Sequence, residues 1–353
     1  MKFVAITIQG IEDVVSKELK DMINVNSEIV ADARVMFEAN LEDVKKFIYM
    51  TRSCDRIYLL YDKLNFVNIE DIKKKVKSMN FEISGSFKVR CFREGEHEFN
   101  SQDVEKSVGG IIHEKGYNVD LTSPDATILV DLIDNLCFIG KYITNKELHK
   151  RVYRVKLHTK TINPLIAYAM IRLSGWKKNQ TLLDPFAKDG IIPIEAAQYA
   201  FNFPRGYFRD EIKFDELNEK IIKKKLNVFC YDSLMQNVKT CEIHAKLAEV
   251  VKFINLGRYD IEWLDTKFKE GEIDYIITHL PFVSLKRDQS KVQKLIKETF
   301  SQAEYILNNL GKIVVFTPRP VIVKKIAKKF KIESERDIII GDSYFSLIIF
   351  VKS

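Results

Sequence analysis

The segment LLDPFAKDGIIPIEAA, residues 182–197, decides the fold of the second half of this 353-residue chain. A short apolar run ends at Asp184, a tight loop keeps Gly190, and a helical pattern follows at once. A carboxylate at the tip of a strand, beside the N-terminus of a helix, forms a cradle for a polar ligand. The segment therefore predicts a strand, a loop and a helix with a ligand at the end of the strand.

Helices and short apolar strands alternate on both sides of this segment, from about residue 160 onward. We expect strands at Thr181–Asp184, Val228–Asp232, Val250–Leu256, Ile273–His279 and Lys312–Thr317, and a closing pair at Asp337–Ile340 and Tyr344–Val351. We expect helices at Pro164–Ser174, Ile192–Phe201, Leu234–Ala248, Lys291–Asn309 and Val321–Phe330. Such alternation requires a mainly parallel sheet covered on both faces. Ligands of such sheets bind outside the C-terminal ends of the strands.

The first half of the chain has a different, α+β pattern. Residues 1–65 follow the order strand, helix, strand, strand, helix, strand, which is typical of a ferredoxin-like unit. Residues 66–145 predict a second unit, which ends in a hairpin with Asp134-Asn135 at its tip. A basic linker, 146–160, then leads to the α/β domain of 161–353.

Composition and charge exclude several classes of protein. The chain has no run of eighteen apolar residues, and Glu12 and Asp13 interrupt any signal-peptide core. Its five cysteines form no C-x-x-C pair, which argues against a zinc site or a disulfide framework. We expect a cytoplasmic protein with no membrane segment and no metal.

Basic residues gather near the junction of the two halves. The stretch KYITNKELHKRVYRVKLHTK, 141–160, holds seven Lys or Arg against one Glu, and the net charge of the chain is +7. Cations interleaved with aromatic side chains are typical of a surface that follows phosphates, although a solvated face is the simpler alternative. The candidate RNA contacts are Arg90, Arg93, His149, Lys150, Arg151 and Arg154.

A second carboxylate points to the kind of cofactor. The strand FCYDSL ends at Asp232, which is placed to accept both hydroxyls of a ribose. The phosphate-binding pattern G-x-G-x-x-G is absent, so NAD fits poorly. S-adenosylmethionine, a nucleoside cofactor without phosphate, fits better.

Several dispersed motifs resemble one known family. LHKRVYR (148–154), INPLIAYAMIRLSGW (162–176) and LLDPFAKDGIIPIEAA are similar to LHKRGYR, LNPTIAAAMI and LLDPFCGSGTIPIEAA of the THUMP-containing RNA guanine methyltransferases. Residues 86–112, followed by VDLTSPDATILVDLIDNLCFIGKYIT (119–144), resemble a THUMP domain, and GIEDVVSKEL (10–19) resembles the family's N-terminal ferredoxin-like domain. The likeness covers nearly the whole chain, and the motifs stand in the right order.

The resemblance implies a tRNA methyltransferase that methylates the exocyclic amine of a guanine, with S-adenosylmethionine as cofactor. It implies a class I, Rossmann-like domain with a mainly parallel seven-stranded sheet, preceded by ferredoxin-like and THUMP domains. The cofactor-binding residues that follow from the motifs are Asn163, Asp184, Pro185, Phe186, Lys188, Gly190, Asp232 and Asp260.

The catalytic motif of the family departs from its usual form here. The fourth strand normally ends in N-P-P-Y, D-P-P-Y or N-L-P-Y, where the side chain and a backbone carbonyl accept the two N–H groups of the amine and the aromatic ring stacks on the base. Here the end is T-H-L-P-F, so the implied catalytic residues are His279, Pro281 and Phe282. A histidine accepts only when neutral, so the rate should rise with pH through about 6.5.

Two further departures leave alternatives open. Lys188 replaces the first glycine of the family's G-S-G, where it could pair with the methionine carboxylate, and Arg258 stands where an acid is usual, although Asp260 could substitute. The main alternative is an inactive methyltransferase that serves as an RNA-binding protein, and a protein partner remains possible. A DNA adenine methylase would not need a THUMP domain. A thiouridine synthase would need an ATP loop and reactive cysteines.

Overall fold

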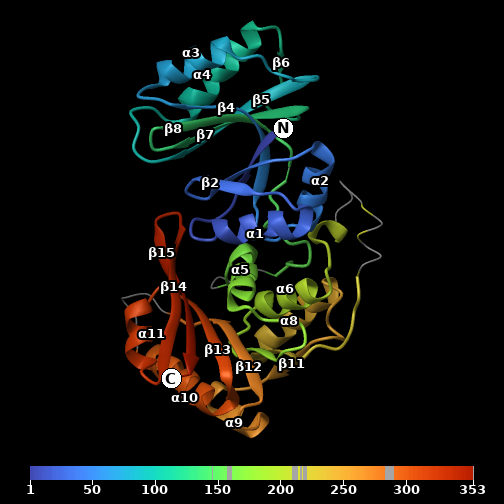
Figure 1. Cartoon of the computed structure of the whole chain (residues 1–353), viewed down its shortest axis with the longest axis vertical. Coiled ribbons are helices and arrows are strands. Elements are labelled where there is room, and N and C mark those ends of the chain that lie inside the picture. Colours follow the sequence, from blue (N-terminus) through green and yellow to red (C-terminus); the bar gives the residue numbers. More distant parts are fainter. Residues whose placement is uncertain are drawn as a thin grey trace.

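The structure, a computed structural model, describes residues 1–144, 146–156, 161–208, 214, 217, 221–282 and 290–352. Its elements form two bodies that follow one another along the longest axis, each built around one sheet (Figure 1). Residues 157–160 of the expected basic linker lie outside the described part. Within the described ranges, no helix is long and apolar enough to cross a membrane.

The N-terminal body contains a single eight-stranded sheet, in the order β2-β3-β1-β4-β8-β7-β5-β6. Its strands are β1 (Lys2–Ile6), β2 (Ser27–Ala31), β3 (Arg34–Glu38), β4 (Arg56–Asn65), β5 (Ser86–Glu94), β6 (Asn118–Val119), β7 (Ala126–Ile133) and β8 (Leu136–Tyr142). Its helices are α1 (Glu12–Ile23), α2 (Leu41–Met50), α3 (Ile69–Ser78) and α4 (Ser101–Glu114). The long strand β4 pairs with β1 at its start and with β8 over the rest, so it joins the ferredoxin-like and THUMP-like parts.

Local sequence explains where these helices begin. Asn68 and Asn100 cap α3 and α4, and an aspartate three residues later closes a capping box in each case. The expected hairpin is confirmed, because β7 and β8 pair around a turn in which Asp134 has a φ of 49°. Asparagine and aspartate tolerate this left-handed backbone better than most residues.

A buried ion pair connects two strands of the eight-stranded sheet that are not neighbours. The Nη2 and Nε atoms of Arg34 lie 2.7 and 2.9 Å from the carboxylate of Asp131, and both side chains are almost completely buried. Arg34 belongs to β3 and Asp131 to β7, which are not neighbours in the sheet. The sheet therefore curves enough to bring β3 and β7 within reach of one another, although three strands lie between them.

The C-terminal body contains a seven-stranded sheet in the order β11-β10-β9-β12-β13-β15-β14. Its strands are β9 (Leu182–Asp184), β10 (Val228–Asp232), β11 (Asn255–Arg258), β12 (Ile273–His279), β13 (Leu307–Thr317), β14 (Phe330–Ile340) and β15 (Ser343–Lys352). Its helices are α5 (Pro164–Ser174), α6 (Ile191–Ala200), α8 (Met235–Leu247), α9 (Leu264–Lys267), α10 (Ser290–Ile306) and α11 (Pro320–Ile326), with 3-10 turns at Arg205–Phe208 and Ile261–Trp263. All pairs are parallel except those that involve β15.

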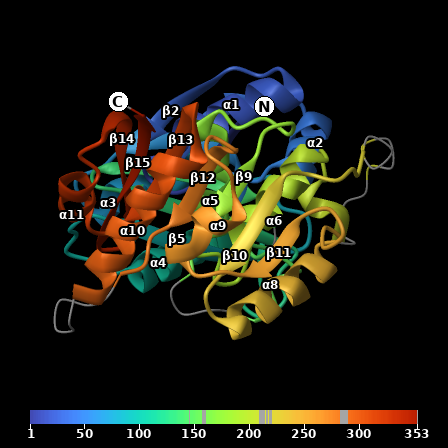
Figure 2. The ribbon, with the colours of Figure 1, turned by 90° about the horizontal axis from the view of Figure 1, so that it is seen from below.

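Apolar side chains fill both faces of this sheet. Residues of α5, α6 and α8 pack on one face, and residues of α10 and α11 pack on the other (Figure 2). From β9 the chain adds β10 and β11 on one side of the sheet, and then adds β12 and β13 on the other side of β9. The order of the strands therefore reverses between β9 and β12. In sheets of this kind, the ligand binds at that point, outside the C-terminal ends of the strands.

Several expected boundaries in the C-terminal body are wrong, among them the starts expected at Lys312 and Asp337 for strands that begin at Leu307 and Phe330. The strand expected at Val250–Leu256 begins only at Asn255, because Glu249 takes a φ of 58° and the next residues turn while Val250 packs into the core. The helix expected to reach Asn309 ends at Ile306, because β13 already starts at Leu307. Strand β14 starts at Phe330, so the helix before it ends earlier than expected.

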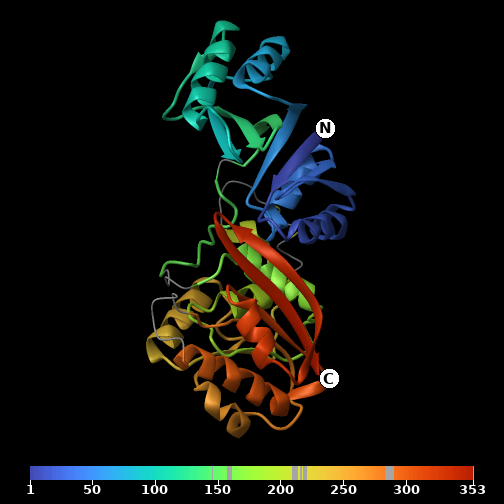
Figure 3. The same ribbon diagram turned by 90° about the vertical axis from the view of Figure 1, so that its left-hand side faces the viewer.

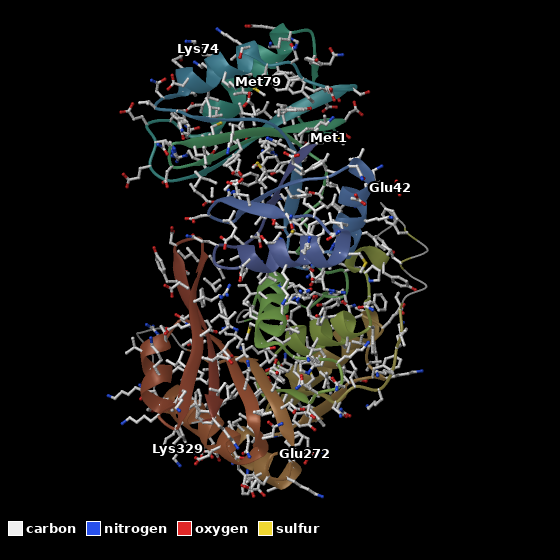
Figure 4. All side chains as sticks on the ribbon, viewed as in Figure 1. Met1, Glu42, Lys74, Met79, Glu272 and Lys329 are labelled. Atoms are coloured by element: carbon white, nitrogen blue, oxygen red, sulfur yellow. The ribbon has the colours of Figure 1, made fainter. Side chains whose placement is uncertain are left out.

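The two bodies contact each other directly. The β14–β15 hairpin reaches the N-terminal body, where Ile339 forms a β-bridge with Gln9 and Arg336 donates to Asp13 at 2.7 Å (Figure 3). Lys74 and Met79 lie at one extreme of the molecule, and Glu272 and Lys329 lie near the other (Figure 4).

Candidate active site

Asp184 lies at the point where the strand order reverses. It ends β9, is buried, and accepts hydrogen bonds from the Thr278 hydroxyl at 2.6 Å and the Phe186 backbone N–H at 3.2 Å. Burial raises the pKa of this carboxyl to about 7, against the lowering effect of the hydrogen bonds from Thr278 and Phe186. The carboxyl of Asp184 is therefore a buried acid with a pKa near neutral pH, and a neighbouring cation would favour its charged form.

Asp232 lies beside it, at the tip of β10. Its carboxylate accepts from the backbone N–H of Lys188 at 3.0 Å, the N–H of Leu234 at 2.9 Å and the Asn237 amide at 3.0 Å. The bond from Lys188 connects the loop after β9 to the end of β10. Both predicted carboxylates are thus brought together at the same edge of the sheet.

The loop between β9 and α6 needs two left-handed residues. Gly190 has a φ of 79° and precedes α6, and a Cβ there would lie 3.2 Å from Cys241. Lys188 has a φ of 54°, a conformation that normally favours glycine. Its Nζ atom donates to the backbone oxygen of His279 at 3.0 Å. The lysine therefore connects the first loop to the tip of β12.

His279 is the last residue of β12, and its side chain is buried at 5% exposure. In the described part of the chain, neither ring nitrogen has a hydrogen-bond partner. Burial and the charge of Lys188 lower the pKa of the imidazole to about 2. The expected rise in rate through about pH 6.5 is therefore wrong as far as His279 is concerned, because this ring is neutral throughout that range.

The remaining predicted site residues take different positions. Phe282, which is partly buried, packs its ring 5.5 Å from His279, and Pro281 precedes it. Asn163 caps α5 through a bond from the Leu165 N–H, and Pro185 and Phe186 follow directly on Asp184. Asp260 is exposed beyond the end of β11, whereas Arg258 is aligned with Asp232 and donates to the Ser233 oxygen.

The structure corrects two of the expected RNA contacts. Arg151 is buried, and its Nε lies 2.8 Å from the Glu195 carboxylate, so it cannot reach a phosphate at the surface. Arg154 is mostly buried and donates to Asp189 at 2.9 Å, in the loop after β9. The run of basic residues predicted a phosphate-binding surface. These two cations instead neutralise acids inside the protein.

The other expected RNA contacts lie nearer the surface. Arg90 and Arg93 are exposed at β5, where Arg90 lies 3.9 Å from Glu105 and Arg93 contacts His97. Lys150 is 70% exposed beside Glu147. His149 is partly buried, and its ring bonds to Asp55, so it mainly holds the chain after β8 against the N-terminal body.

Sequence reasoning missed a buried cluster that joins the two bodies. Glu195 of α6 accepts from Arg52 of the N-terminal body, from Arg151 and from the Tyr153 hydroxyl, each at 2.8 Å. Although burial raises the pKa of Glu195, the charges of Arg151 and Arg52 lower it to about 2. The sequence feature that could have predicted this cluster is the single acid in the apolar helix IIPIEAAQYA. An acid that is buried with such a helix requires cationic partners.

The seven-stranded sheet, whose order reverses between β9 and β12, and the carboxylates at its strand ends are those of a class I methyltransferase domain, which here follows an α+β module. The chain belongs to the RMKL-like methyltransferase domain family, whose model matches residues 151–340. Models of a THUMP domain and of the RlmL ferredoxin-like domain match residues 66–140 and 2–58. These matches confirm the expected family and fold, and the cofactor of the family is S-adenosylmethionine.

Known relatives match along nearly the whole chain. A tRNA (guanine(6)-N2)-methyltransferase of Methanocaldococcus jannaschii is 29% identical and covers 94% of this chain and 95% of its own length. One of Archaeoglobus fulgidus is 27% identical and covers 90% and 83%. Among solved structures, TrmN from Thermus thermophilus has a TM-score of 0.78 at 23% identity, and covers 100% of this chain and 99% of its own. At this identity, the likeness to TrmN shows the fold alone.

Proposed function

We propose that this protein transfers a methyl group from S-adenosylmethionine to the exocyclic N2 amine of a guanosine in tRNA. The first two relatives described above are named for guanine 6, which makes nucleotide 6 the first target to test. A 27% identical Methanocaldococcus relative is named for N2 dimethylation of guanine 10, covering 75% of both chains. All of these names describe methyl transfer to the N2 amine of a guanine in tRNA.

The residues at the strand ends fit the cofactor. Asp232 keeps an acceptor position for a ribose hydroxyl beyond the three donors that it already binds, and Asp184 supplies a second acid in the same edge. Bound S-adenosylmethionine supplies an activated methyl group on a sulfonium. The negative charge of the Asp232 carboxylate at the strand ends favours that cation.

One observation carries the assignment of the base site: at the tip of β12 stands a buried imidazole that has no hydrogen-bond partner among the residues that the structure describes. A buried polar group is normally hydrogen-bonded, so two unsatisfied ring nitrogens indicate that a ligand completes the site. Because its pKa is about 2, the imidazole is neutral and offers one nitrogen as acceptor. We assign to it one N–H of the guanine amine.

The neighbouring residues complete the placement of the base. The backbone carbonyl of Leu280 is proposed to accept the second N–H, which localises the nitrogen lone pair toward the methyl group. Phe282, beside His279, is proposed to stack on the flipped base. Orientation and hydrogen bonding would then provide most of the catalysis.

The contacts of the protein with RNA and its own location in the cell are also proposals. The exposed cations Arg90, Arg93 and Lys150 support phosphate contacts on the THUMP side and after β8. The cysteines, all buried free thiols, fit a reducing cytoplasm.

The test is methyl transfer to tRNA, followed by digestion and identification of the nucleoside by mass spectrometry. We expect N2-methylguanosine from a tRNA with guanosine at position 6, and no transfer to that position when inosine, which lacks the amine, replaces it. His279→Ala should reduce the rate, and His279→Asn, which keeps an acceptor, should preserve or raise it.

The alternative of an inactive RNA-binding protein has its own outcome. If the wild type binds tRNA and transfers nothing while His279→Asn transfers methyl, the natural protein is a disabled methyltransferase. If methylated adenosine or another nucleoside appears instead, the assignment of the guanine amine is wrong.

A further inference from the structure

The two acceptors proposed for the amine do not by themselves select guanine. The His279 ring and the Leu280 carbonyl would accept the N–H groups of any exocyclic amine, and adenine and cytosine also carry one. Guanine differs from both because its O6 and N7 lie side by side as two acceptors, on the edge of the base opposite N2. An enzyme specific for guanine therefore needs a donor beyond the residues that hold the amine.

Arg319 lies beside the proposed base site, just after the strand next to β12. His279 of β12 and Phe316 of β13 are register partners, and the Leu280 N–H donates to the Phe316 oxygen at 3.3 Å. Phe282 follows His279 by three residues, and Arg319 follows Phe316 by three residues. The chain therefore carries Phe282 and Arg319 equally far along the sequence past two paired strand ends.

Arg319 and Phe282 line the same small hollow. Pro281 also contributes to its wall, and the rest of the wall is mainly apolar and comes from the starts of α10 and α11. The hollow holds about 10 Å³, which is room for one water molecule at most. A base is too large to enter it, so a base stacked on Phe282 would lie across its mouth with one edge toward Arg319.

The guanidinium of Arg319 is available to a ligand. The residue is half-buried, and its backbone N–H donates to the Thr317 hydroxyl at 3.0 Å. Among the residues that the structure describes, none accepts a hydrogen bond from the guanidinium or forms an ion pair with it. The planar fork of N–H donors in an arginine fits two adjacent acceptors, such as O6 and N7 of guanine.

We propose that Arg319 selects guanine by donating hydrogen bonds to O6 and N7, while His279 and the Leu280 carbonyl hold the N2 amine. The inference rests on the proposed function, because it takes the base to be stacked on Phe282 with its amine at His279. Adenine and cytosine lack this pair of acceptors and would leave the guanidinium without partners. One bidentate contact of this kind discriminates between bases on the order of tenfold or more.

The experiment measures methyl transfer by the full chain to tRNA that carries guanosine, 2-aminopurine riboside or 7-deazaguanosine at position 6, the first target named above. Both analogues keep the N2 amine, but 2-aminopurine lacks O6 and 7-deazaguanosine lacks N7. In the wild type, kcat/KM should be lower for each analogue than for guanosine, on the order of tenfold for 2-aminopurine. In Arg319→Met, the ratio of kcat/KM for guanosine to that for 2-aminopurine should fall toward one.

The matched control is Lys325→Met, which removes an exposed cation from α11. This variant should keep the wild-type ratio, because Lys325 does not line the hollow. Calorimetric titration with S-adenosylmethionine should give the same affinity for the wild type and Arg319→Met, which shows that the variant is folded. The comparison of guanosine with 7-deazaguanosine needs no variant.

A phosphate contact of Arg319 would have a different outcome. Arg319→Met would then lose activity equally on guanosine and on 2-aminopurine, because both tRNAs carry the same phosphates. An unchanged ratio in Arg319→Met, or equal wild-type rates on guanosine and 7-deazaguanosine, would overturn this inference and leave the proposed function standing. Absence of N2 methylation of guanosine by the wild type would overturn the proposed function, and this inference with it.

Discussion

Replacing Glu195 by Gln should destabilise the protein strongly, because the change leaves two buried arginines without their counter-charge. Glu195 is fully buried and lies 2.8 Å from both Arg52 and Arg151. The fall of its pKa from 4.5 to about 2 corresponds to about 3 kcal/mol in favour of the folded state. Removing one partner of a buried ion pair costs a similar amount, about 3–5 kcal/mol.

The free energy of unfolding can be measured by urea denaturation, followed through the fluorescence of Trp176, which is buried in the C-terminal body. The matched control is Glu304→Gln, which breaks the surface pair with Lys329 and should cost less than about 1 kcal/mol. If Glu195→Gln costs no more than this control, the cluster does not hold the two bodies together as we infer.

The pH dependence gives an independent check on the same residue. The pKa of Glu195 is lower in the folded state than its ordinary value of 4.5, so its contribution is fully present above that value. It is lost as the pH falls from about 4.5 toward 2. The difference in stability between wild type and Glu195→Gln should therefore narrow over this range, and a constant difference would contradict the ionised Glu195.

Three further predictions concern the site and the RNA. The pH profiles of methyl transfer by wild type and by His279→Asn should have the same shape near pH 6.5, because the wild-type imidazole is already neutral there. A rise in rate near pH 6.5 that is present in the wild type and absent from the variant would contradict the lowered pKa of His279. Asp232→Ala should weaken S-adenosylmethionine by about 1.5–3 kcal/mol in calorimetric titration, and an unchanged affinity would remove this carboxylate from the site. Reversing the charges of Arg90, Arg93 and Lys150 together should lower the log–log salt slope of tRNA binding by roughly 2 to 3, whereas Lys329→Glu, near the opposite end of the molecule, should not change it.

Local patterns were sufficient for much of the architecture. The alternation of helices and apolar strands after residue 160 predicted the mainly parallel sheet, and the hairpin at Asp134 formed as expected. The strand ends also placed Asp184 and Asp232 correctly at one edge, because parallel strands all end on the same side. Boundaries failed where packing outweighed local preference, as at Val250, which is apolar but packs from a turn.

Charge patterns were a poorer guide, because a sequence does not tell a solvated cation from a buried one. Arg151 and Lys150 are adjacent and chemically similar, yet Arg151 is buried against Glu195 and Lys150 is exposed. The difference depends on an acid 44 residues away in the chain. Likewise, Arg34 and Asp131 meet only because the eight-stranded sheet curves.

The sequence by itself determined the class of the protein, since its motifs, their order and the acids at the strand ends depend on local chemistry. It also showed that His279 and Lys188 depart from the usual pattern. Only the tertiary structure decided what these departures do, because the pKa of His279 depends on burial and the reach of Lys188 depends on how the first loop meets the tip of β12. Solvent exclusion and contacts between distant segments exist only after the chain has folded.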